Sequence, residues 1–171
     1  MPLFAPKLGL ALAGGGARGG AHIGVLRVLN EIDYIPDVIA GTSIGGLVAV
    51  MRGAGWSLEQ IEEFFTAHDF RAMMEIGREG TGLISNTPFR SELVRLFGDA
   101  ALRDLTPKVA VVAADIRAFQ RVMITRGSVV QALLATTALP GLFPPVEWGE
   151  HLLVDGGVVE NVPTQAAYQM G

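Results

Sequence analysis

The fold of this chain is decided by the stretch Val38-Ile39-Ala40-Gly41-Thr42-Ser43-Ile44-Gly45. Its first three residues favour a short buried strand, and the apolar run from about Ile44 to Arg52 predicts a helix directly after it. The turn between them matches G-x-S-x-G, a pattern in which a sharp turn lifts a serine hydroxyl above the edge of a sheet. The pattern predicts Ser43 as a nucleophile, held by Gly41, Thr42, Ile44 and Gly45. The alternative is that Ser43 only caps the helix, and the two roles are compatible.

A similar unit precedes this one. Leu8 to Ala13 is a short apolar run that suits a buried strand, and apolar residues recur at helical spacing between Ala21 and Asp33. Further strands are predicted at Lys108–Ile116 and Arg121–Thr125, and helices at residues 57–65, 88–97 and 129–136. A hairpin is predicted around Gly149-Glu150. Alternating strands and helices of this kind predict a single α/β domain over residues 1–171, a three-layer sandwich with a mostly parallel central sheet.

A glycine-rich loop, Gly14-Gly15-Gly16-Ala17-Arg18-Gly19, joins the first strand to the first helix. It formally fits G-x-G-x-x-G, but a dinucleotide site would need an acidic residue at the end of the next strand, which ends in Ala40-Gly41 instead. A P-loop is excluded because no Gly-Lys-Ser/Thr closes the loop. Two interpretations stay open at this point: a tight turn without a ligand, and an oxyanion hole built from backbone N–H groups that face Ser43.

A serine nucleophile needs a base, and the chain offers three histidines, His22, His68 and His151. None has an obvious partner in the sequence, and His151 lies roughly 13 Å from Asp155 along one strand. Asp155 itself ends a strand, followed by Gly156 and Gly157. A direct Ser–Asp pair would require burial to raise the pKa of that carboxyl. The alternative for Asp155 is an Asx-turn at the strand end.

The composition narrows the classes of function. Hydrophobic residues make up 50% of the 171 residues and charged residues 18%, with a net charge of −4 and no basic run, so nucleic-acid binding is set aside. The absence of cysteine excludes disulfide scaffolds and thiolate metal sites, and agrees with a cytoplasmic protein. The apolar run after Lys7 is too short for a signal peptide, and three prolines interrupt the uncharged window 127–146, so no transmembrane helix is expected.

Three motifs stand in order along the chain: the glycine loop, the serine turn and Asp155-Gly156-Gly157. Together they resemble the patatin-like phospholipase family. Additional segments that match the family are 21–26, 113–115, 137–145 and 158–163. Each motif is weak by itself, but all of them in this order are highly specific.

The resemblance implies a serine acyl hydrolase that cleaves fatty-acyl esters of lipids through an acyl-serine intermediate. Ser43 would be the nucleophile and Asp155 its base, and the backbone N–H groups of Gly14, Gly15, Gly16, Ala17, Arg18 and Gly19 would form the oxyanion hole. No metal and no cofactor are implied. Arg18 is either an anion contact or a solvated loop charge, and Asp115 is structural.

Several expectations accompany this interpretation. Walls for an acyl chain are expected from Leu139, Leu142, Phe143, Phe64-Phe65 and Met73-Met74. Family members continue past Met170-Gly171 into another strand, so the domain is expected to be short at its C-terminus, with an open sheet edge. The lipid substrate is compatible with peripheral contact to a membrane surface. Two other functions stay open: an acyltransferase that uses the same serine, and a non-catalytic module whose glycine loop binds an anion or nucleotide.

Overall fold

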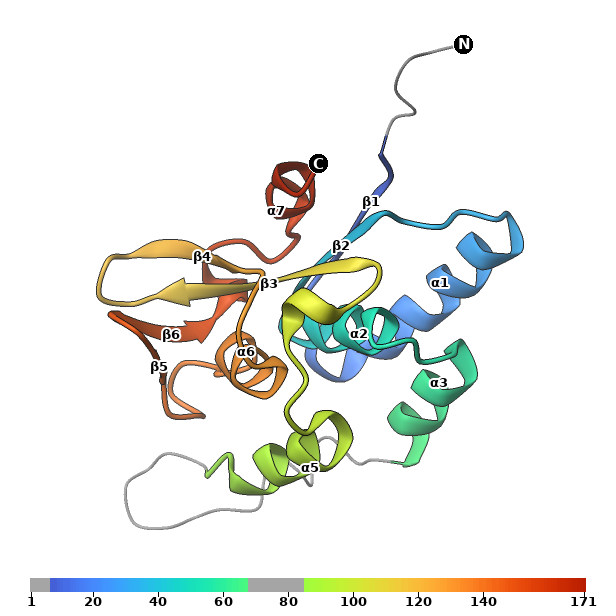
Figure 1. The fold of residues 1–171 in the computed structure, drawn as a ribbon. Coiled ribbons are helices and arrows are strands. Elements are labelled where there is room, and N and C mark those ends of the chain that lie inside the picture. Colours follow the sequence, from blue (N-terminus) through green and yellow to red (C-terminus); the bar gives the residue numbers. More distant parts are fainter. Residues whose placement is uncertain (1–6, 68–84) are drawn as a thin grey trace.

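The computed structural model describes residues 7–67 and 85–171, and its centre is a six-stranded sheet (Figure 1). The strands are listed here in chain order: β1 (Gly9–Leu12), β2 (Val38–Thr42), β3 (Lys108–Asp115), β4 (Gln120–Ile124), β5 (Val146–Trp148) and β6 (His151–Asp155). Followed from one hydrogen-bonded neighbour to the next, the strands connect as β1-β2-β3-β6-β5. β4 pairs with β3 along the edge opposite β2 and β6. β1, β2 and β3 are parallel, whereas β4 and β6 are antiparallel to β3. Because β5 is antiparallel to β6, it runs in the same direction as β3.

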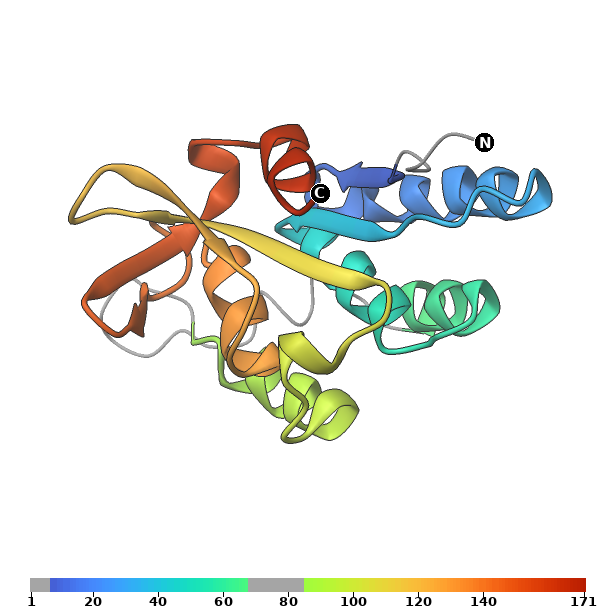
Figure 2. The same ribbon diagram turned by 45° about the horizontal axis from the view of Figure 1, so that its top comes forward.

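Helices cover both faces of the sheet. They are α1 (Ala21–Glu31), α2 (Ile44–Gly53), α3 (Leu58–Ala67), α5 (Thr87–Phe97), α6 (Val129–Thr136) and α7 (Thr164–Gln169), with short 3-10 turns at Gly16–Gly20, Leu102–Asp104 and Gly156–Val158. Figure 2 shows α7 on one side of the sheet, and α2, α3, α5 and α6 on the other. This arrangement confirms the predicted three-layer α/β fold.

The two faces of β3 belong to two different cores, because side chains alternate along a strand. Val109, Val111 and Ala113 pack into the larger core with α2 and α6. Ala110 and Val112 belong to a smaller core with Ala166 and Ala167 of α7. β3 therefore lies buried between two layers of helices, as a central strand with a continuous apolar sequence should.

Local sequence signals placed the ends of several elements correctly. Ser57 and Gln60 form a complete capping box before α3: Ser57 N donates to Gln60 Oε1 over 2.8 Å, and Gln60 N donates to Ser57 Oγ over 3.2 Å. Gly98 stops α5 with φ 52°. Gly149 joins β5 to β6 with φ 58°, as a glycine-first hairpin turn requires. These devices are local, which is why the sequence alone revealed them.

Some expectations lie outside the described residues, namely those for His68 and for Met73-Met74. Across residues 7–67 and 85–171, no helix is both long and apolar enough to cross a membrane.

Candidate active site

Ser43 and Asp155 meet because two strands run toward each other along the same edge of β3. β2 ends with Thr42 paired to Val112, and β6 ends with Asp155 paired to the next residue, Ala113. β4 pairs with the other edge of β3, over residues 111–115. Ser43 follows the carboxyl end of β2, and Asp155 is the last residue of β6. Because β6 is antiparallel to β3 while β2 is parallel to it, the two carboxyl ends come together.

Ser43 adopts the backbone conformation of a sharp strand-to-helix turn, with φ 54° and ψ −125° as the residue before α2. Such a conformation is strained for any residue with a side chain. The glycines on either side make it sterically feasible. A Cβ on Gly41 would collide with the backbone of Gly45, and one on Gly45 would collide with the carbonyl oxygen of Leu12. The turn is therefore packed too closely for other residues at these two positions.

The two functional side chains are in direct contact. The Ser43 hydroxyl donates to Asp155 Oδ2 over 2.6 Å, and the Gly157 amide donates to Asp155 Oδ1 over 2.7 Å. Asp155 is 2% exposed, and this burial raises the pKa of its carboxyl, although both hydrogen bonds act in the opposite direction. A Cβ on Gly156 would collide with the carbonyl of Val112, so the turn after Asp155 also requires glycine. The arrangement can move a proton from Ser43 to Asp155.

The glycine loop lies beside the serine. A Cβ added to Gly14 would come within 3.3 Å of Ser43 Cβ, so the loop approaches the nucleophile as closely as only glycine permits. The Gly14 amide already donates to the carbonyl oxygen of Asn161 over 3.0 Å. It is therefore unavailable as an oxyanion donor. Gly16 has φ 55°, and no backbone partner is found for the amides of Gly15 and Gly16 in the described part of the chain.

The other loop residues have different surroundings. Arg18 is exposed, and both its backbone amide and its Nε lie within hydrogen-bonding distance of the Gly15 carbonyl, at 3.2 and 3.5 Å. Ala17 is exposed as well. Gly19 is buried against Ile44, and a Cβ there would collide with the Ile44 side chain. Gly19 thus fixes the distance between the loop and the start of α2.

Three residues that the sequence analysis did not select hold the site together. Thr136, the last residue of α6, accepts the Ser43 amide with its Oγ1 over 2.8 Å. Thr42 Oγ1 donates to the carbonyl oxygen of Glu160 over 2.9 Å. The neighbouring Asn161 holds Gly14, as described above. Glu160 and Asn161 belong to the family-like segment 158–163, which was the only signal for them in the sequence.

The two histidines among the described residues, His22 and His151, have partners other than Ser43. His151 Nδ1 lies 2.7 Å from Asp115 Oδ2, and His22 Nε2 lies 2.8 Å from the carbonyl oxygen of Ala13. Neither contact could be predicted from the sequence, in which no histidine has an obvious partner. Asp115 also accepts the amides of Arg117 and Leu152, in keeping with a structural role.

The expected acyl-chain walls divide into two groups. Leu139 and Leu142 are exposed, in the loop that follows α6. Phe143 is buried and lines a small hollow with Ala138 and Leu134. The ring of Phe64 meets those of Trp56 and Phe65 edge to face, and Phe64 belongs to the larger core with Phe65 packed against it. The first group, Leu139, Leu142 and Phe143, follows the end of α6 that contacts Ser43. The second group, Phe64 and Phe65, packs in or against the hydrophobic core.

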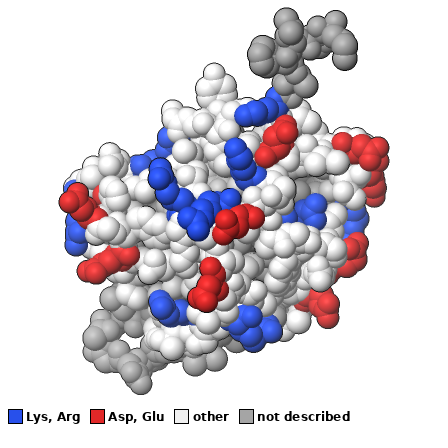
Figure 3. Space-filling model, viewed as in Figure 1, with Lys and Arg blue, Asp and Glu red and all other residues white. Residues whose placement is uncertain are grey.

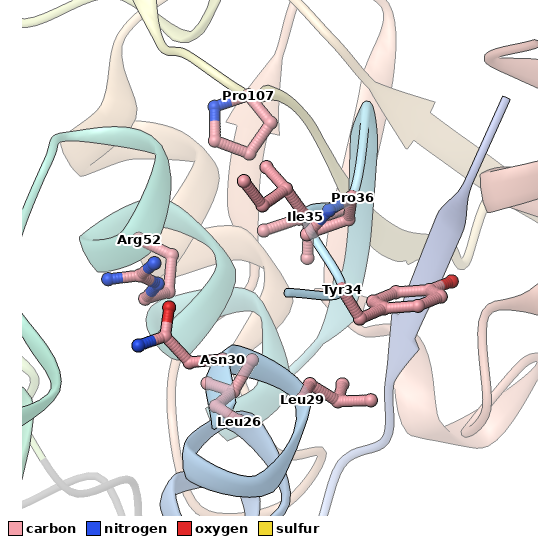
Figure 4. A pocket seen from close by; sticks show the side chains of 9 residues that line it. Leu26, Leu29, Asn30, Tyr34, Ile35, Pro36, Arg52 and Pro107 are labelled. Atoms are coloured by element: carbon pink, nitrogen blue, oxygen red, sulfur yellow. The ribbon is translucent and has the colours of Figure 1, made fainter. Parts of the chain in front are cut away.

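A separate hollow lies at the other end of β2 (Figure 4). Its lining includes Asn30, Tyr34 and Arg52, and its volume of about 50 Å³ leaves room for a few water molecules. On the face shown in Figure 3, acidic and basic side chains of the described residues are interspersed. Within residues 7–67 and 85–171, no three His, Asp or Glu side chains are grouped as a metal site would require.

Comparison with known proteins shows similarity over nearly the whole chain. The family model described as "Patatin-like phospholipase" matches residues 10–168. An uncharacterised NTE family protein of Mycobacterium tuberculosis is 36% identical over 161 residues, which cover 92% of this chain and 27% of that protein. Patatin-like phospholipase domain-containing protein 7 of Mus musculus is 33% identical, with coverage of 96% and 13%. Neuropathy target esterase sws of Drosophila melanogaster is 31% identical, with coverage of 96% and 12%.

Two crystal structures share the fold. VipD from Legionella pneumophila superposes with a TM-score of 0.75 at 16% identity, over 93% of this chain and 47% of that one. The type III effector protein ExoU gives a TM-score of 0.58 at 18% identity, over 80% and 40%. This chain therefore spans less than a third of the sequence relatives described above, and less than half of each of these two structures.

Proposed function

Since this chain belongs to the patatin-like phospholipase family, we propose that it is a serine acyl hydrolase that cleaves fatty-acyl esters of lipids. The observation that carries the proposal is the 2.6 Å hydrogen bond from Ser43 Oγ to Asp155 Oδ2. A carboxylate near its ordinary pKa is a weak base, and burial of Asp155 raises that pKa toward the range in which it can accept a proton usefully. Neither His22 nor His151 contacts Ser43, because each has another partner.

The reaction begins when Ser43 Oγ attacks the ester carbonyl carbon. Asp155 Oδ2 takes the serine proton as the C–O bond forms, and the former carbonyl oxygen becomes an oxyanion. The oxyanion then collapses, the bond to the leaving alcohol breaks, and Asp155 returns the proton to that alcohol. Water attacks the acyl-serine in the second half, with Asp155 again accepting and returning a proton, and the fatty acid leaves.

The oxyanion requires hydrogen-bond donors, and the geometry narrows the choice among the loop amides. Gly14 and Ser43 both donate their amides elsewhere, to Asn161 and Thr136. We therefore assign the role to the amides of Gly15 and Gly16, which follow Gly14 in the loop and have no backbone partner in the described part of the chain. The first turn of α2 adds the positive end of a helix dipole at Ser43, which favours developing negative charge.

A fluorophosphonate probe followed by peptide mapping tests the nucleophile directly, because only an activated serine reacts with it. We expect labelling at Ser43 and turnover of a chromogenic fatty-acyl ester, both of which Ser43→Ala should abolish without loss of the fold. An unlabelled wild-type chain, or labelling at another serine, would end the proposal. A melting temperature that rises with added nucleotide in such an unreactive chain would favour the ligand-binding module instead.

Substitution of Gly16 tests the donor assignment. Gly16→Val should reduce kcat by ~10²-fold, because a β-branched residue resists the positive φ that presents the amide. Gly20→Val is the matched control, since Gly20 has an ordinary helical φ and open space around its Cα. Equal activity of the two folded variants would remove Gly16 from the oxyanion hole.

A further inference from the structure

We infer that Thr136 is a positioning residue for the nucleophile: its hydroxyl holds the backbone of Ser43 in the conformation from which Oγ can attack. The inference rests on the proposed role of Ser43. Thr136 lies 93 residues away in the sequence, at the end of α6, and its Oγ1 accepts the Ser43 amide over 2.8 Å. Thr136 is fully buried, and so is Thr42, the last residue of β2 before Ser43.

The direction of both hydrogen bonds of Thr136 is fixed by its partners. The Ser43 amide can only donate, and the carbonyl oxygen of Val112, 2.5 Å from Oγ1, can only accept. The threonine hydroxyl therefore has one arrangement: it accepts from the serine turn and donates to β3. This chain of two bonds ties the nucleophile to the central strand at the register position where β2 ends.

The serine turn needs such a tie because its conformation is strained. A residue with φ 54° and ψ −125° stays there only when its surroundings determine its backbone at several points. Thr42 supplies one point through Glu160, and the helix α2 supplies another through the bond from Leu47 N to Ser43 O. Thr136 is the contact to the amide of Ser43 itself. Loss of this contact would free the turn to relax, and the serine oxygen would move with it.

The methyl group of Thr136 has a separate role, and this allows a clean test. A Cβ added to Gly46 in α2 would lie 3.2 Å from Thr136 Cγ2, so the methyl packs against the first turn of that helix. Valine keeps a methyl for this contact and loses the hydroxyl, whereas serine keeps the hydroxyl and loses the methyl. The two substitutions therefore distinguish the effect of the hydroxyl on the position of Ser43 from the effect of the methyl on packing against α2.

The next residue provides a matched control. Thr137 Oγ1 donates to the carbonyl oxygen of Leu133 over 2.7 Å, within the last turn of α6, and among the described residues it forms no hydrogen bond with the serine turn. A Thr137→Val variant also replaces a threonine hydroxyl by a methyl at the same helix end. The Thr137 hydroxyl bonds only to the backbone of α6, whereas the Thr136 hydroxyl joins the backbones of Ser43 and Val112.

The experiment measures kcat, KM and the rate of fluorophosphonate labelling at Ser43 in Thr136→Val, Thr136→Ser, Thr136→Ala and Thr137→Val. We expect Thr136→Val to lower kcat and the labelling rate by ~10- to 100-fold with little change in KM, since small misplacement of a reacting group has effects of that size. Thr136→Ser should stay within a few-fold of wild type, although it melts at a lower temperature. Thr137→Val should react like wild type, and Thr136→Ala should react much more slowly than Thr136→Ser.

Several results would overturn the inference. One is a folded Thr136→Val that labels as fast as wild type. Another is a Thr136→Ser that falls as far as Thr136→Ala, which would assign the effect to the methyl. Failure of both hydroxyl-free variants to fold would show that the hydroxyl serves the fold rather than the nucleophile. A wild-type chain that never reacts at Ser43 would instead refute the proposed function, so the two failures are distinguishable.

Discussion

Asp155 of β6 pairs with Ala113, two residues before Asp115 on β3, and the two aspartates have similar solvent exposure, 2% for Asp155 and 3% for Asp115. Their carboxyl groups nevertheless behave in opposite ways. The contact with His151 Nδ1, supported by backbone amides, lowers the pKa of Asp115 from 3.8 to about 2. Burial raises the pKa of Asp155 above that same ordinary value. Similar solvent exposure therefore does not imply the same pKa.

The difference has two causes: desolvation is the largest influence on the pKa of Asp155, whereas the contact with His151 is the largest influence on the pKa of Asp115. Asp115 lies against an imidazole nitrogen at 2.7 Å and receives the amides of Arg117 and Leu152, at 2.9 and 3.3 Å. Asp155 receives only a neutral hydroxyl and one amide. Hydrogen bonds that stabilise the charged form compensate for desolvation at Asp115 and fall short at Asp155. The first carboxylate is suited to hold a β-hairpin, and the second to exchange a proton.

Exchanging each aspartate for asparagine gives the largest expected contrast. Asp155→Asn keeps the shape but cannot accept the serine proton, so kcat/KM should fall by ~10³-fold or more. Asp115→Asn should retain most of the activity at temperatures where it is folded. Ester turnover and labelling of the two purified variants check this, and an active Asp155→Asn would show that another group is the base.

The pH dependence of activity sharpens the assignment. Asp155 must be ionised to accept a proton, so kcat/KM should fall as the pH drops through the raised pKa of Asp155, at a pH above 3.8. The same acid limb should persist in His22→Gln and His151→Gln. Disappearance of the limb in either histidine variant would assign it to that histidine.

Protein stability should depend on pH with opposite signs at the two carboxyls. The depressed pKa of Asp115 gives stability above pH 3.8 that is lost as the pH falls through about 2, so Asp115→Asn should melt several degrees lower at neutral pH. The raised pKa of Asp155 gives stability at low pH that is lost as the pH rises through the folded-state value. Asp155→Asn should therefore melt at a higher temperature than wild type at neutral pH, with a difference that shrinks toward pH 4. Melting curves across that range provide the measurement.

The smallest effect is expected at the partner of Asp115. The His151 side chain is 39% exposed, and solvent weakens its interaction with the carboxylate. His151→Gln leaves the amides of Arg117 and Leu152 in place, so it should lower the melting temperature by less than half of the change seen in Asp115→Asn. A larger loss than in Asp115→Asn would mean that His151, rather than the amides, carries the hairpin.

Much of the site could be predicted from the sequence, because its signals are local. The G-x-S-x-G turn between a strand and a helix identified Ser43, and the close packing of Gly41 and Gly45 explains why those positions are glycine. Asp155 was found as the end of a strand with two glycines after it. The antiparallel direction of β6 and the partner of the Gly14 amide were not found. The direction of β6 depends on its pairing with β3. The partner of the Gly14 amide lies in a loop more than 140 residues away in the sequence.

By itself, the sequence determined the α/β order of elements, the sharp turn at Ser43 and the choice of Ser43 and Asp155 as candidate site residues. Glycine spacing, helix caps and apolar periodicity act over a few residues and can be read along the chain. The tertiary structure alone decided that β2 and β6 end against each other on one edge of β3, that Thr136 holds the Ser43 amide, and that the pKa values of Asp115 and Asp155 shift in opposite directions. The physical reason is that strand pairing and the count of donors around a buried charge depend on residues far apart in sequence, whose proximity exists only after folding.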